Sequence, residues 1–275
     1  MNDHASRTTG WQLEQNAPEA YEQYLVPPIF EPWADRLLDT GGVHEGDHLL
    51  DVACGTGIVA RHAAPQVGNS GSVVGLDINE RMLATAEETA ADIQFPIEWR
   101  QGDATDLPFS DEEFDVACCQ QSLQFFDDPI AAVKEIQRVL VPGGRGALSV
   151  WRPLDYQPAY VILAEALERH IGDEAGAMMR SPFPTWDGED LRTLVQDAGL
   201  DDVSVTIEIG SVRYPSVKEF VRREAASSPL AEPIAAVDSE VRDELVHDVE
   251  DALHRYIDDE GIVSPMETYV ITATR

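Results

Sequence analysis

The sequence Leu49-Leu50-Asp51-Val52-Ala53-Cys54-Gly55-Thr56-Gly57 decides the fold of this chain. A short apolar run leads into a glycine turn, and the residues from Ile58 to Ala64 suit a helix. This order of strand, turn and helix start presents backbone N–H groups and the positive end of a helix to a ligand. The stretch by itself therefore predicts a site for a nucleotide.

Strands and helices are expected to alternate after this turn. The apolar runs predict strands at 48–53, 72–77, 97–102, 114–119 and 145–151, and the intervening segments 57–67, 79–91 and 129–140 suit helices. Such alternation predicts an α/β fold with a parallel, doubly wound, Rossmann-like sheet. Ligands of these sheets bind beyond the carboxyl ends of the strands.

The segments around this core are expected to form helical additions to a single domain, 1–275. Residues 16–42 suit two helices interrupted at Pro27-Pro28, and they are either a core-packing pair or a lid over the ligand. Residues 43–152 form the cofactor-binding core, and 153–186 and 214–264 are cap insertions. Within the second half we expect helices at 158–171 and 187–198, strands at 203–209 and 267–274, and an acidic helical stretch at 216–260.

The chain is strongly acidic. Its 51 Asp and Glu residues exceed its 19 Lys and Arg residues, which gives a net charge of −32 over 275 residues. This field disfavours nucleic acid as a partner. An acidic shell with only two lysines, Lys134 and Lys218, resembles cytosolic proteins of salt-loving organisms, although an ordinary acidic protein remains an alternative.

The remaining composition favours a cytoplasmic protein without a membrane span. No stretch approaches the ~20 continuous apolar residues that a spanning helix needs, and the first residues lack the apolar core of a signal peptide. Three cysteines, two of them adjacent, do not make a disulfide framework. The seven histidines are scattered and suggest no metal site. The sequence leaves the oligomeric state open.

Asp77 is the strongest single ligand candidate. It ends the second predicted strand, 20 residues after Gly57, where a carboxylate can accept both hydroxyl groups of a ribose. The alternative role is an N-cap for the next helix, but Asn79 can supply that cap.

The type of nucleotide follows from the polar residues near the other strand ends. Gly55-Thr56-Gly57-Ile58-Val59-Ala60 also fits the G-x-G-x-x-A pattern of dinucleotide-binding enzymes, so an NAD-dependent oxidoreductase is an alternative. Against it, Asp51 lies inside the first strand, where such enzymes carry apolar residues. Asp103 and Ala104 suit one face of a single adenosine, and the segment 120–124 suits the other.

The segment from about 45 to 151 resembles the class I S-adenosylmethionine-dependent methyltransferases, in the small-molecule branch that includes the ubiquinone and menaquinone enzymes and other type 11-like methyltransferases. The matching motifs are Asp51 to Gly57, Asp77, Gly102-Asp103-Ala104 with Leu107-Pro108-Phe109, Phe114-Asp115, and Arg138 to Gly144. The resemblance implies a seven-stranded sheet whose last strand, 267–274, is antiparallel. It also implies S-adenosylmethionine as the cofactor and methyl transfer to a small molecule.

The resemblance also assigns cofactor-binding roles by position. Ala53, Gly55, Gly57 and Gln120 would face the methionine part and Asp51 its ammonium group, while Asp77 would take the ribose. The residues that would border the adenine are Ile78, Met82, Gly102, Asp103 and Ala104. Ala53 stands where the longer family pattern has glycine.

No catalytic residue can be carried over, because Gln124-Phe125-Phe126 stands where many relatives have histidine. A non-catalytic S-adenosylmethionine-binding protein therefore remains an alternative. The candidate lining of the acceptor pocket is aromatic, which favours an apolar or aromatic acceptor, although core packing explains these residues equally well. The candidates are Tyr21, Tyr24, Phe125, Trp151, Arg152, Met178, Met179, Phe183 and Trp186.

The charge excess predicts a dependence of folding on salt. Repulsion among the acidic groups is screened at molar salt and acts fully near zero ionic strength, so dilution should lower the melting temperature or unfold the chain. Circular dichroism melts across that range measure this. A melting temperature that stays constant would rule out salt adaptation.

Overall fold

The computed structural model describes residues 17–275, and a parallel sheet forms its centre. The strand order is β3-β2-β1-β4-β5-β8-β6, and the two-residue strand β7 pairs with β8. Strands β1 to β5 are mutually parallel, and β8 runs antiparallel to both β5 and β6. The predicted doubly wound sheet and its antiparallel last strand are therefore confirmed. The bounds are β1 His48–Val52, β2 Ser72–Asp77, β3 Ile97–Gln101, β4 Phe114–Gln120, β5 Leu140–Trp151, β6 Asp201–Tyr214, β7 Ile257–Asp258 and β8 Gly261–Thr274.

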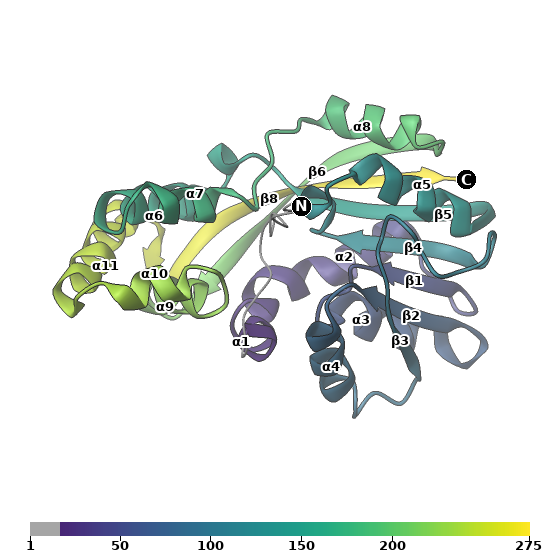
Figure 1. The fold of residues 1–275 in the computed structure, drawn as a ribbon, viewed down its shortest axis with the longest axis horizontal. Helices are drawn as coiled ribbons and strands as arrows, with labels where there is room; N and C mark the ends of the chain where they lie inside the picture. The colour runs from purple at the N-terminus through teal and green to yellow at the C-terminus, as the bar shows by residue number, and fades with distance from the viewer. Residues whose placement is uncertain (1–16) are drawn as a thin grey trace, which may run out of the picture.

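Helices cover both faces of this sheet, as Figure 1 shows. On one face α2 (Glu31–Gly41) and α3 (Ile58–Val67) pack on Leu49 and Ala147. On the other face α5 (Pro129–Val139) and α8 (Gly188–Asp197) share a hydrophobic core with Leu50 and Leu148, the residues that follow Leu49 and Ala147 in their strands. Because successive strand residues point to opposite faces, coverage on both sides requires the continuous apolar runs that the sequence contains. Cys118 and Cys119 lie buried on opposite faces of β4.

The two last long strands extend beyond the main sheet. Figure 1 shows β6 and β8 running from the sheet into a separate group of helices, which we call the cap. The cap comprises α6 (Pro158–His170), α7 (Asp173–Arg180), α9 (Val217–Ala226), α10 (Ala231–Ala236) and α11 (Ser239–Leu253). It has its own hydrophobic core, in which Leu163, Phe220 and Leu245 are buried.

The bounds of two strands predicted in this half are corrected. The strands predicted at 203–209 and 267–274 are each 14 residues long, and residues 210–214, omitted from the first, pair with residues 262–266, omitted from the second. Gly210 and Pro265 obscured this continuation, because both residue types usually interrupt strands. The stretch 216–260 is mostly helical, as predicted: it contains α9, α10, α11 and the 3₁₀ turn His254–Tyr256, and ends with the short strand β7.

The N-terminal segment joins the cap to the core. Helix α1 (Ala17–Tyr24) contacts α9 of the cap and α4 (Glu80–Thr89) of the core, as its position in Figure 1 also indicates. Arg61 on α3 donates to Glu22 at 2.7 Å, and Ser227 Oγ donates to the Ala20 carbonyl at 3.1 Å. The Pro27-Pro28 pair lies in a π-helical turn, Val26–Phe30, which leads directly into α2. No helix among residues 17–275 has the length and apolar character to cross a membrane.

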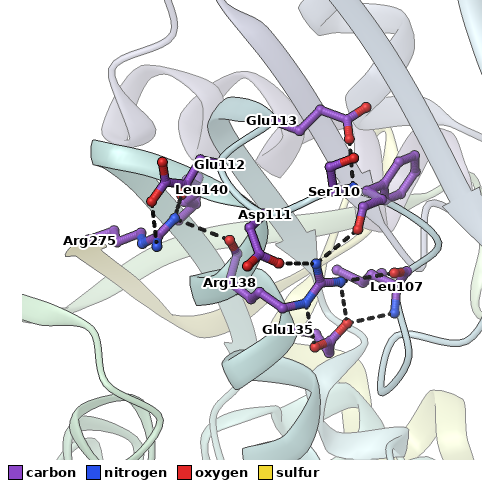
Figure 2. A network of polar contacts seen from close by, with 10 residues as sticks. Leu107, Ser110, Asp111, Glu112, Glu113, Glu135, Arg138, Leu140 and Arg275 are labelled. Carbon is purple, nitrogen blue, oxygen red and sulfur yellow. Dashed lines mark hydrogen bonds and ion pairs between the residues drawn. The ribbon is translucent and has the colours of Figure 1, made fainter.

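An arginine at the end of α5 holds the β3–β4 connection in place (Figure 2). Arg138 donates to the carbonyl groups of Leu107 and Phe109 and pairs with Asp111 and Glu135 at 2.7–2.8 Å. Glu135 in turn accepts from the Leu107 N–H at 2.8 Å, and the Arg138 guanidinium holds the pKa of that carboxyl below its usual range. Arg275, at the end of the chain, donates to the Arg138 carbonyl at 3.1 Å.

Arg138→Met should lower the free energy of unfolding by about 2 kcal/mol, because Glu135 and two carbonyl groups lose their hydrogen bonds to the guanidinium. Urea denaturation at constant salt measures the loss. The matched control is Arg169→Met, which breaks an ion pair whose arginine side chain is 58% exposed, and should cost less than ~1 kcal/mol. Equal losses in the two variants would contradict this role of Arg138.

Candidate active site

A cavity of about 670 Å³ lies beyond the carboxyl ends of the central strands. Its lining includes residues at the ends of four strands: Ala53 after β1, Asp77 in β2, Gln120 in β4 and Trp151 in β5. Helix α1, the π-helical turn and the cap complete its walls. The site therefore lies at the edge of the sheet that the sequence predicted.

The glycine turn forms one wall of the cavity. Ala53 and Gly55 have φ angles of +55° and +56°, which glycine adopts without strain and alanine does not. Gly55 faces open space, since the nearest atom to a Cβ built there is Tyr21 Cε1 at 4.0 Å. Gly57 does not line the cavity, because the Trp99 indole occupies the space that its Cβ would take. A side chain at Gly57 is thus excluded by packing, independently of any ligand.

Asp77 fixes the turn and still faces the cavity. Its Oδ2 accepts from the Gly55 N–H and its Oδ1 from the Asn79 N–H, both at 2.8 Å. A carboxylate offers about four acceptor positions, so Asp77 can still accept from a ligand hydroxyl group. Asn79 caps α4 by accepting from the Arg81 N–H, which confirms that Asp77 is not needed for that task.

Asp51 is a buried carboxyl group with few hydrogen bonds to offset the loss of water around it. It is 1% exposed, and the Ala60 N–H at 3.0 Å is its one recorded donor among the described residues. Burial is the main cause that raises its pKa to about 8, and the negative charge of Asp77 adds to the effect. A buried acid in this state is suited to receive a cationic group of a ligand.

The proposed adenine side is only partly assembled around the cavity. Ile78, which is 60% exposed, and Met82 line it. Gly102, Asp103 and Ala104 do not: the Asp103 carboxylate accepts from the N–H and hydroxyl of Thr105, both at 2.8 Å. These three residues follow β3, next to β2 at the edge of the sheet.

Of the predicted acceptor residues, Tyr21, Phe125, Trp151, Met179 and Phe183 line the cavity. Gln120, also in the lining, donates to the Phe30 carbonyl at 3.1 Å and so connects β4 to the π-helical turn. Phe30 packs between Tyr21 and Trp151, with ring centroids 5.1 and 6.3 Å away. The aromatic character of this side of the cavity is therefore as expected.

The remaining acceptor candidates lie outside the cavity. Arg222 lies over the Tyr24 ring at 4.7 Å, and Arg152 pairs with Glu267. Met178 is partly buried against the cap core, and Trp186 against the core that α5 and α8 form with the sheet. Packing and ion pairing account for all four residues.

Sequence reasoning missed a group of lining residues from the N-terminal segment, the cap and β8. The cavity lining also contains Leu25, Ile29, Phe30, Tyr160, Pro182, Glu224 and Met266. The signal for Glu224 was present: it falls on the apolar face of α9, together with Val217, Phe220 and Val221. An acid at a core-facing helical position is costly and therefore informative.

Asp51→Asn should stabilise the protein, and the gain should grow with pH. The unfolded carboxyl ionises near pH 3.8 and the folded one near pH 8, so wild-type stability falls as pH rises between these values. Asparagine removes this cost while retaining an oxygen for the Ala60 N–H. Melting temperatures of wild type, Asp51→Asn and the exposed control Asp106→Asn across this range test the point. A difference that does not vary with pH would contradict it.

Known proteins resemble this chain in sequence and fold. Residues 50–148 match a family model described as a methyltransferase domain. A demethylmenaquinone methyltransferase of Staphylococcus carnosus is 33% identical over 203 residues, which cover 70% of this chain and 81% of that protein. A 2-phytyl-1,4-naphtoquinone methyltransferase of Synechocystis sp. is 42% identical over 191 residues, which cover 66% of this chain and 78% of that protein.

The fold comparison agrees. A phosphoethanolamine N-methyltransferase 2 of Haemonchus contortus, solved in complex with S-adenosyl-L-methionine, superposes with a TM-score of 0.59 at 20% identity. The match covers 94% of this chain and 56% of that one. Sequence and fold together show that this chain belongs to the class I S-adenosylmethionine-dependent methyltransferases.

Proposed function

We propose that this enzyme binds S-adenosylmethionine in the cavity and transfers its methyl group to an aromatic, quinone-type acceptor in the reduced, hydroxyl-bearing form. The observation that carries the proposal is the continuity of the cavity. Its lining joins the acidic turn region, with Asp51 and Asp77, to an aromatic region with Trp151 and Phe183. A polar cofactor and a planar acceptor can therefore meet in one cavity.

The acidic region fits the cofactor. Asp77 retains acceptor capacity for a ribose hydroxyl group, and Asp51 lies where a buried ammonium group would compensate its charge. The Gly55 backbone leaves room for close approach, since a Cβ there would touch only Tyr21. When bound, the cofactor supplies a methyl group that its sulfonium has already activated. The two carboxyl groups also favour that positive charge electrostatically.

The acceptor side is proposed from chemistry and from the relatives. The two relatives described above are named for naphthoquinone-type acceptors. An oxidised quinone is electron-poor, whereas the reduced ring with hydroxyl groups is a nucleophile that can attack a methyl group. The protein's contribution is to align this ring behind the methyl group, an effect worth several kcal/mol.

Calorimetric titration with S-adenosylhomocysteine tests the cofactor. Asp77→Asn should weaken its binding about 10- to 100-fold, because hydrogen bonds to a charged group are lost. Asp106→Asn makes the same charge change at an exposed position and should leave the affinity unchanged. Binding of NAD with no response to S-adenosylhomocysteine would overturn the assignment.

Transfer of a labelled methyl group tests the acceptor. With a short-chain 2-alkyl-1,4-naphthoquinone, the label should appear in the product when dithionite keeps the ring reduced and not when the ring is oxidised, because only the reduced ring is nucleophilic. Cofactor binding without any transfer to the reduced ring would instead support the non-catalytic alternative or a different acceptor.

A further inference from the structure

Glu224 is a buried acid in the wall of the cavity. It lies on α9 of the cap, is 2% exposed, and lines the same cavity as Asp51 and Asp77. An acid at a core-facing position is costly unless its charge is compensated or used. None of the cofactor-binding roles described above involves Glu224.

Two tyrosine hydroxyl groups hold this carboxylate. Tyr160 on α6 donates to Glu224 Oε1 at 3.0 Å, and Tyr214 on β6 donates to the same oxygen at 2.9 Å. Burial raises the pKa of both tyrosines, so they remain protonated donors. No hydrogen bond to Oε2 is recorded among residues 17–275. One carboxylate oxygen is therefore fixed while the other remains available.

The surroundings of Glu224 bring its pKa close to neutral pH. Burial raises the pKa of Glu224 to about 7, while the two tyrosine hydrogen bonds act in the opposite direction. Two other titratable groups belong to these surroundings: Tyr21 of α1 lines the cavity, and the Arg223 guanidinium lies 5.9 Å from the centre of the Tyr214 ring. A general base is most effective when its pKa lies near the working pH.

We propose that Glu224 is the catalytic base that takes the hydroxyl proton of the acceptor, and that Tyr160 and Tyr214 are positioning residues for it. This inference rests on the proposed function, because it assumes an acceptor that carries an aromatic hydroxyl group. It supplies the base that the sequence lacks at Gln124-Phe125-Phe126. The base then comes from the cap, on the acceptor side of the cavity.

The reaction balances without an oxidant or reductant. Glu224 takes the O–H proton, and the electron pair left on the oxygen is delocalised onto the adjacent ring carbon. That carbon forms a bond to the methyl group as the S–CH₃ bond breaks, and the bonding pair remains on sulfur. The ring carbon then loses its proton to water, which restores the aromatic ring, and Glu224 returns its own proton to the oxygen. The net products beside the methylated ring are the demethylated cofactor, a neutral thioether, and one proton.

Glu224→Gln is the decisive variant, because glutamine keeps an oxygen that can accept from both tyrosines and loses only the basic group. With the reduced 2-alkyl-1,4-naphthoquinone, kcat/KM should fall at least ~100-fold. The affinity for S-adenosylhomocysteine and the melting temperature should remain those of the wild type. The matched control is Glu219→Gln on the same helix, which does not line the cavity and should retain wild-type activity.

The pH profile separates catalysis from a structural role. Wild-type kcat/KM should fall as pH drops below about 7, because the base becomes protonated. Tyr214→Phe should move this fall to higher pH, since the lost hydrogen bond had lowered the pKa of Glu224. Glu224→Gln should abolish the fall altogether. Glu224→Gln with wild-type kcat/KM and an unchanged profile would overturn the proposal.

A binding measurement keeps the test independent of turnover. Calorimetry with 1-naphthol, in the presence of S-adenosylhomocysteine at pH 8, should show about tenfold weaker binding to Glu224→Gln than to wild type or Glu219→Gln. Equal affinities would overturn the role of Glu224. If wild type and Glu224→Gln differ in this way while wild type does not methylate the reduced naphthoquinone, the proposed acceptor fails and the role of Glu224 as hydroxyl-binding base stands.

Discussion

The hydrogen bond from the Gly55 N–H to the Asp77 carboxylate is the interaction on which the site depends. It joins the turn after β1 to the end of β2 at 2.8 Å, so two strand ends are held in one geometry. The second Asp77 oxygen accepts from Asn79 and thereby positions the start of α4. Trp99 acts from the other side, because its indole packs where side chains at Gly57 and Gly75 would lie. The shape of the turn therefore follows from these neighbours before any ligand is considered.

The cavity concentrates buried acids in two places. Asp51 and Asp77 lie at the strand ends, and Glu224 lies on the cap side, all within one lining. Burial raises the pKa of each of the three, so the free protein bears the cost of keeping acids away from water. Such a cost is typical of sites whose groups serve a ligand or a reaction rather than stability.

The long strands β6 and β8 connect the two halves of the molecule. Each is 14 residues long, and their outer parts pair only with one another and with β7. Tyr214 at the end of β6 and Met266 in β8 bring this ribbon to the cap core. The same ribbon places Tyr214 against Glu224, so the antiparallel pair positions an acceptor-side group as well as closing the sheet.

The sequence alone determined the α/β alternation, the edge of the sheet at which the cavity lies, and the position of Asp51 and Asp77 at that edge. These features are local, because strand runs, glycine turns and residues at strand ends are read within a few positions of one another. Tertiary structure decided which residues share the cavity. It left Tyr24, Arg152 and Trp186 outside and brought Glu224 and Tyr160 into the lining from segments 64 residues apart. Which side chains meet there depends on how the cap is placed beyond the ends of the strands, and that placement follows from contacts between distant segments, which no local pattern specifies.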